Sequence, residues 1–255
     1  MQFDELKDFL EEKVNQYNTI HFIEADPVSV PHRYTRKEDI EIAGFLAATI
    51  SWGNREQIVK NAHRLLDKFG ESPYDFIMSY KPNQLKRFNG FVYRTFNESD
   101  LLFFIKTLRH VYTKHNGIES IFNQHSTNED TQIAIHIFRK HFLELKHDIH
   151  VEKHIADPLK GSAAKRINMF LRWMVRKDKK GVDFGLWKSI PSSALSCPLD
   201  FHSGNIARKL GLLTRNQNDA KAVIELDKNL RLMDKNDPVK YDFALFGLGI
   251  FDHFK

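Results

Sequence analysis

The sequence predicts an all-α protein with about a dozen helices. Apolar residues recur at helical spacing along most of the chain, and no segment shows the sustained alternation of apolar and polar residues that a half-buried strand requires. Glycine and proline are sparse, with 12 and 8 among 255 residues, which disfavours a turn-rich β-fold. The apolar fraction of 42% is ordinary for a globular chain and is enough for a packed core.

The first predicted helix covers 3–17 and carries an apolar stripe at helical spacing. The segment 37–52 is apolar on most sides, as a buried helix is. The next helix, 54–70, begins at Asn54, a favourable N-terminal cap, and ends at Gly70, a common helix stop. Proline near the start of two following stretches indicates two further helices, over 72–80 and 81–88.

The rest of the chain continues the helical pattern. A helix capped by Ser99 or Asp100 runs to Gly117, and the segment 146–158 ends at a proline. We expect further helices, or in one case a short turn, over 117–125, 128–146, 163–176, 184–191, 201–212, 217–233 and 237–251.

A single cysteine, Cys197, excludes a disulfide framework and any cysteine-ligated zinc or iron–sulfur site within the chain. One thiol also fits a reducing compartment. The N-terminal residues lack the basic start and apolar run of a signal peptide, and no stretch approaches the roughly 18 apolar residues of a membrane span. We therefore expect a cytoplasmic protein with no membrane contact, and we expect a monomer.

Basic residues concentrate in one segment of a mildly basic chain, whose formal net charge is +5. This distribution leaves two interpretations open, a solvated helix face followed by a charged loop, or a patch that faces phosphate. Between 160 and 180 a single acid, Asp178, stands against eight basic residues, which are Lys160, Lys165, Arg166, Arg172, Arg176, Lys177, Lys179 and Lys180.

The same segment contains a compact turn that leads into a helix, in "LKGSAAKRINMFLRW" (159–173). Small residues over 161–164 let the backbone approach another chain closely, and the free N–H groups of the following first helical turn can bind a phosphate. Lys165 lies in that positive first turn, whose field disfavours an ammonium group, and a neutral amine is the better nucleophile.

A second stretch, "CPLDFHSGNIARKLGL", contains Asp200 just before a helix. An N-terminal cap is the default role for an aspartate in this position. Local spacing alone does not indicate that Asp200 meets Lys165.

Together the two stretches resemble the helix-hairpin-helix DNA glycosylase superfamily. "LKGSAAK" resembles its hairpin, with Lys165 in the position of the attacking lysine, while "PLDFH" and "ARKLGL" resemble its second segment, with Asp200 as the essential aspartate. Ser162 and Ala163 depart from the hairpin pattern. The spacer between Lys165 and Asp200 is long, and in this it resembles the spacer of the archaeal 8-oxoguanine glycosylase branch. The stretch "YDFALFGLGIF" resembles sequences of a related uncharacterised bacterial group.

The resemblance implies a glycosylase-like unit over 1–255, built from two helical subdomains with a cleft between them. We expect one subdomain over 45–180, ending in the hairpin, and the other over 1–44 plus 181–255. The implied partner is damaged double-stranded DNA, which places the protein at the nucleoid. The implied activity is excision of an oxidised purine, 8-oxoguanine, with strand nicking. The alternative is a helix-hairpin-helix nucleic-acid-binding module that has lost catalysis.

The resemblance also implies roles for individual residues. Lys165 and Asp200 are the catalytic pair. Met169, one helical turn after Lys165, and Trp52 are candidates for contact with the extruded base. The alternative is core filling for Met169 and an aromatic residue of the core or its rim for Trp52. The expected DNA contacts are Gly161, Ser162, Ala163, Arg166, Asn54, Arg55 and His202; capping is the alternative for Asn54 and a structural hydrogen bond for His202.

No metal site is expected. His147, His150 and His154 have a spacing that places them on one helix face, but chance spacing is easy among 13 histidines, and only Glu152 and Asp157 lie nearby as carboxylates. No cofactor motif is present, and the resemblance leaves open only a monovalent cation bound by hairpin carbonyls.

Overall fold

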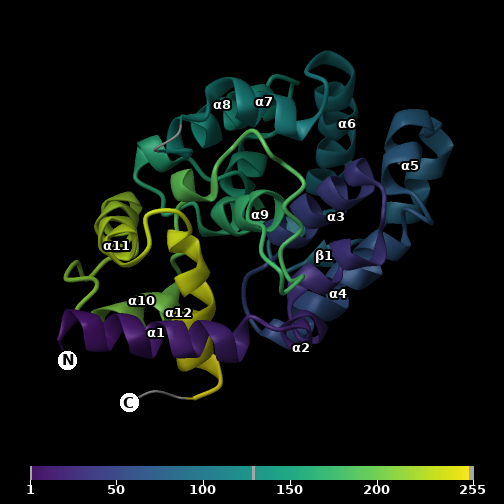
Figure 1. Ribbon diagram of the computed structural model, residues 1–255. Helices are drawn as coiled ribbons and strands as arrows, with labels where there is room; N and C mark the ends of the chain where they lie inside the picture. The colour runs from purple at the N-terminus through teal and green to yellow at the C-terminus, as the bar shows by residue number, and fades with distance from the viewer. Residues whose placement is uncertain (1, 128–129, 253–255) are drawn as a thin grey trace.

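The computed structural model describes residues 2–127 and 130–252. Within these residues the protein is mostly helical, which confirms the predicted class (Figure 1). The α-helices are α1 (Phe3–Tyr17), α2 (Ile20–Glu24), α3 (Lys37–Thr49), α4 (Arg55–Asp67), α5 (Pro73–Ser79), α6 (Glu98–Lys114), α7 (Ile118–His125), α8 (Gln132–Phe142), α9 (Lys165–Val175), α10 (Phe201–Lys209), α11 (Ala220–Met233) and α12 (Tyr241–Ile250).

Several local predictions need correction. The cap of α6 is Asn97, which accepts hydrogen bonds from two backbone N–H groups, and not Ser99 or Asp100. The stretch Pro82–Phe88 is a 3-10 helix. The range 184–191, for which a short turn was the alternative to a helix, contains no helix. A short antiparallel hairpin, whose strands β1 (Val92–Tyr93) and β2 (Phe96–Asn97) have two residues each, precedes α6. The predicted start of α8 at 128 lies outside the described residues.

Helix α3 lies inside the molecule because its residues are apolar on nearly every side. It packs on α9, and Gly44 allows this close approach, since a Cβ there would lie 3.2 Å from Met174. In Figure 1 α9 occupies the centre of the molecule, with α3 beside it. Among the described residues, no helix combines the length and the apolar character that crossing a membrane requires.

The buried apolar residues form two clusters. The larger cluster draws mainly on α3, α4, α6, α8 and α9, and the smaller on α1, α10, α11 and α12. Helix α12 packs against both α1 and α10 within the smaller cluster (Figure 1). The subdomain boundaries at 45 and 180 stay a prediction.

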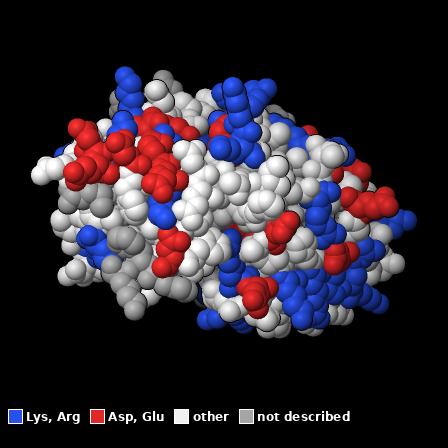
Figure 2. All heavy atoms as spheres, turned by 60° about the horizontal axis from the view of Figure 1, so that its bottom comes forward, with Lys and Arg blue, Asp and Glu red and all other residues white. Residues whose placement is uncertain are grey.

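Charge is unevenly distributed over the surface. Figure 2 shows acidic side chains gathered at the upper left of the view, whereas basic side chains gather at the lower right and in a second group near the top. Helix α1 contributes acids from its first turn, Asp4 and Glu5.

Candidate functional site

A tight turn places Lys165 at the start of α9. Asp157 caps the short 3-10 helix before the turn by accepting a backbone N–H bond of 3.1 Å. Gly161 (φ 92°) and Ala164 (φ 47°) then adopt left-handed backbone conformations. Glycine reaches this region freely, whereas Ala164 does so at a cost of roughly 1–2 kcal/mol. Ala163, one of the two departures from the hairpin pattern, has no such conformation.

The turn is attached to the start of α11. The carbonyl of Gly161 accepts a hydrogen bond from the N–H of Ala220 at 3.0 Å, and Ser162 pairs with Asp219 in an isolated antiparallel bridge. The hydroxyl oxygen of Ser162 also accepts from the N–H of Ala164 at 3.1 Å. These contacts fix the turn from both sides and orient the first turn of α9.

The N-terminus of α9 has no side-chain cap, because its N-cap residue is Ala164. The starts of α4 and α10, in contrast, are capped by Asn54 and Asp200. The first N–H groups of a helix have no acceptor within the helix, so an uncapped start is a favourable place for an anion.

Asp200 uses its two carboxylate oxygens for different partners. Oδ1 accepts hydrogen bonds from the N–H groups of His202 (2.9 Å) and Ser203 (3.0 Å), and thereby caps α10. Oδ2 lies 3.8 Å from Nζ of Lys165. The cap that local spacing predicted and the meeting with Lys165 that the resemblance implied therefore coexist. Both side chains are about one-quarter exposed, at 25% and 26%, so solvent reaches the pair.

Lys165 and Asp200 line a pocket of about 1070 Å³. This volume lies just above the range of about 300–1,000 Å³ that small-molecule sites occupy. The pocket brings together the expected site residues except Gly161, which does not line it. They are Lys165, Asp200, Ser162, Ala163, Arg166, Asn54, Arg55, His202, Met169 and Trp52.

Met169 and Trp52 supply apolar parts of the wall. Met169 is buried, and its sulfur lies 3.4 Å from Nζ of Lys165, which donates to it. Trp52 is half-buried and stacks on His154, with ring centroids 5.9 Å apart. The guanidinium of Arg166 lies 4.7 Å from the ring of Trp52, so this aromatic side chain is held in place by the protein itself.

The two arginines of the expected DNA contacts are turned toward the protein. The Arg166 guanidinium donates to the carbonyls of Thr49 and Lys153, and burial lowers its pKa to about 10. Arg55 forms an ion pair of 3.2 Å with Asp26, and burial lowers its pKa as well. Three rings lie within 5.3 Å of the Arg55 guanidinium, namely those of Phe22, Phe246 and Phe251.

Asn54 and His202 differ in their engagement. Asn54 caps α4 by accepting a hydrogen bond from the N–H of Gln57 at 3.1 Å, as predicted. His202 is exposed at the start of α10, and its ring lies beside that of Phe201 at 5.6 Å.

A further acid that lines the pocket, Asp242, was missed by sequence reasoning. It is 6% exposed, lies on α12 and forms an ion pair with Arg172 of α9. Burial raises the pKa of Asp242 to about 6, while the charges of Arg172 and Lys165 oppose the increase. A lone carboxylate in the otherwise apolar stretch "YDFALFGLGIF" is the sequence signal that could have identified it.

The basic run of 160–180 splits into a buried part and an exposed part. Arg172 and Arg176 are only 3% and 2% exposed, and both pair with the buried Asp183. They therefore do not face phosphate, in contrast to the patch interpretation. The exposed basic residues at the pocket are Lys160 and Lys153, and neither forms an ion pair in the part of the chain that the structure describes.

The three histidines considered for a metal do not converge. They lie on or beside the 3-10 helix Ile149–His154. Nε2 of His147 is 3.6 Å from Glu152, whereas His150 and His154 both contact the buried Asp100, at 2.9 and 3.2 Å.

Comparison with known proteins adds a family and no function. The model of a family described as "Protein of unknown function (DUF2400)" matches residues 26–251. The chain belongs to this family. The DUF2400 match covers every pocket-lining residue except Phe22. No curated protein and no solved structure matches the chain.

Proposed function

We propose that the protein is a DNA N-glycosylase with AP lyase activity of the helix-hairpin-helix superfamily, acting on an oxidised purine, with 8-oxoguanine as the first substrate to test. One observation carries the proposal. The amine of Lys165 lies 3.8 Å from the carboxylate of Asp200, and both line a pocket that solvent reaches. A nucleophile next to a base, in a pocket large enough for a base and its sugar, is what attack on a glycosidic carbon requires.

In the proposed reaction Asp200 accepts a proton from the Lys165 ammonium group, and the neutral amine attacks C1′ of the sugar. The bond between C1′ and the base breaks, and the base leaves with the bonding electron pair and takes up a proton. The nitrogen on C1′ then loses a proton, the C1′–O4′ bond breaks and O4′ takes up a proton, which opens the sugar ring and gives a Schiff base. The Schiff base permits β-elimination, which removes a proton from C2′ and expels the 3′ phosphate. The alternative role is electrostatic: Asp200 stays ionised, and its carboxylate stabilises the positive charge that develops on the sugar.

Features around the pair support a DNA substrate. The uncapped start of α9 offers backbone N–H groups to a phosphate. The ammonium groups of Lys153 and Lys160, which form no ion pair with any described residue, lie on the same pocket. A target base must leave the duplex to reach Lys165, at a cost of a few kcal/mol for unstacking. Met169 and Trp52 would contact the extruded base. In this proposal the pocket is the cleft between the two helical subdomains.

A monovalent cation at the hairpin stays a prediction. The carbonyls of Gly161 and Ala163 already accept hydrogen bonds, from the backbone of Ala220 and the side chain of Asn168. A carbonyl oxygen has a second lone pair, so a cation would share these oxygens, and no step of the reaction depends on it.

Borohydride trapping tests the proposal. The wild-type protein should form a covalent adduct with a duplex that contains 8-oxoguanine, because borohydride reduces the Schiff base. Lys165→Gln should bind the same duplex within a few-fold of wild type, keep its circular dichroism spectrum and lose the adduct. Equal trapping by Lys165→Gln would assign the nucleophile to another residue.

A panel of duplexes with other damaged bases distinguishes substrate choice from mechanism. Trapping on a different lesion would retain the lysine mechanism and correct the base. Binding by the wild type with no adduct on any lesion would contradict the lysine mechanism and leave the non-catalytic helix-hairpin-helix module as the function.

A further inference from the structure

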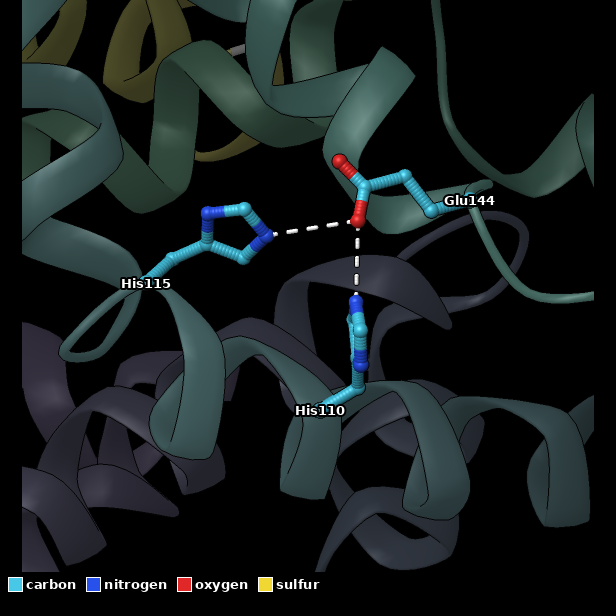
Figure 3. Close-up of side chains that lie close together, drawn as sticks. All are labelled: His110, His115 and Glu144. Carbon is cyan, nitrogen blue, oxygen red and sulfur yellow. Dashed lines mark hydrogen bonds and ion pairs between the residues drawn. The ribbon is translucent and has the colours of Figure 1, made fainter.

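A second group of chemically reactive side chains lies apart from the pocket, where α6 and α8 end. His110 is on α6, His115 is the C-cap residue of α6, and Glu144 follows α8. Figure 3 shows both imidazole rings directed at the Glu144 carboxylate. Nε2 of His110 and of His115 lie 2.9 and 3.3 Å from the same oxygen, Oε2. None of these residues lines the pocket.

A fourth side chain completes the arrangement. His141, on α8, directs Nδ1 at the other carboxylate oxygen of Glu144 and thereby orients it. Three imidazoles from two helices thus converge on one carboxylate. In metal sites the ligating side chains are usually held in orientation by hydrogen bonds from neighbouring residues, as His141 holds Glu144 here.

The geometry fits a single ion. One ligand atom from each of His110, His115 and Glu144 lies within 4.8 Å of the other two. Bonds of about 2.0–2.1 Å in a tetrahedral zinc site place ligand atoms about 3.3 Å apart, so the side chains need only small rotations. The histidines are 23% and 22% exposed, which gives an ion a path from solvent.

We propose that His110, His115 and Glu144 bind one divalent transition-metal ion, of which Zn²⁺ is the probe, with water in the fourth position. Two imidazoles and a carboxylate are a common ligand set for zinc, whereas Mg²⁺ and Ca²⁺ prefer oxygen ligands alone. The bound ion links the end of α6 to the segment after α8. Because it binds only the folded chain, it raises the free energy of unfolding by RT ln(1 + c/Kd), where c is the free Zn²⁺ concentration, so the gain grows with the logarithm of the affinity.

The test is a titration of the full-length, untagged chain, stripped with a chelator, against Zn²⁺ by calorimetry and by competition with a chromogenic chelator. We expect one site of micromolar affinity or tighter, a rise in Tm with zinc, and no comparable site for Mg²⁺ or Ca²⁺. His110→Asn, His115→Asn and Glu144→Gln should each weaken binding by about tenfold or more. The matched control is His21→Asn, which removes an exposed histidine of α2 and should bind zinc as the wild type does.

Two results would overturn the assignment. One is the absence of a stoichiometric zinc site in the wild-type chain, and the other is equal binding by the wild type and all three ligand variants, which would indicate adventitious binding to scattered histidines. If a ligand variant fails to fold, Co²⁺ added to the wild type decides the matter. A tetrahedral nitrogen–oxygen site gives strong visible absorption, whereas an octahedral aquo-like spectrum would contradict the site.

Discussion

Asp200 has two separable roles, and two substitutions distinguish them. Asp200→Ala removes both the oxygen that caps α10 and the oxygen that faces Lys165. Asp200→Asn keeps a capping oxygen, because asparagine is as good an N-cap as aspartate, but removes the negative charge 3.8 Å from the amine. Stability should therefore follow the cap, and chemistry should follow the charge.

The magnitudes can be estimated from the contacts. Loss of the cap costs about 1 kcal/mol of unfolding free energy. The partly exposed ion pair contributes about 0.5 kcal/mol or less. Urea denaturation should thus give a loss of about 1–1.5 kcal/mol for Asp200→Ala, and a loss below about 0.5 kcal/mol for Asp200→Asn. Both variants should lower the single-turnover trapping rate on an 8-oxoguanine duplex by about 100-fold or more.

Asn97→Ala provides a matched control, since Asn97 also accepts two backbone N–H groups at a helix start and does not line the pocket. It should lose stability as Asp200→Ala does and trap at the wild-type rate. Wild-type trapping by Asp200→Asn would show that Asp200 is only a cap. A stability loss for Asp200→Asn as large as for Asp200→Ala would refute the estimate of the cap.

Two further predictions concern stability alone. Burial raises the pKa of Glu41 to about 7 in the folded chain. The folded state therefore holds this proton more tightly than the unfolded state does. As a result, the free energy of unfolding falls by up to about 3 kcal/mol as the pH rises from 4.5 through 7. Glu41→Gln should flatten that fall in urea unfolding at a series of pH values, and parallel curves for the two proteins would contradict it. Gly247→Ala would place a methyl group in the ring of Tyr17, where α12 crosses α1, and should lower the unfolding free energy by about 1–3 kcal/mol. Gly249→Ala, whose nearest neighbour would lie at 3.2 Å, should cost less, and equal losses in thermal unfolding would count against the steric argument.

Most of the helices could be predicted because apolar residues recur along them at helical spacing. Helix α3 was expected to be buried, and α4 was expected to begin after Asn54, because both features follow from local residue types. Whether a short helix is an α-helix or a 3-10 helix is harder to predict, because apolar residues at i and i+3 fit one or two turns of either. The left-handed conformation of Ala164, and not of Ala163, depends on contacts with α11 that no local pattern contains.

The site was only partly accessible from sequence. Motif resemblance led to Lys165 and Asp200, although 35 residues separate them, but it gave no account of the side chains behind them. Arg172 was read as part of a basic run because sequence shows charge and not burial. Its partner Asp242 lies on α12, far along the chain, so the pair forms only when the two helices meet.

The ion pairs Lys165–Asp200 and Arg172–Asp242 both connect the larger apolar cluster to the smaller one. Lys165 and Arg172 lie on α9, which belongs to the larger apolar cluster, whereas Asp200 and Asp242 lie on or before helices of the smaller one. A buried pair such as Arg172–Asp242 contributes little net stability, because desolvation offsets much of the attraction. The pair instead fixes the position of α9 relative to α12, because a shift between the two helices would leave a buried charge without a partner. Because α12 packs on α10, which Asp200 caps, fixing α9 on α12 also fixes the distance between the amine of Lys165 and the carboxylate of Asp200.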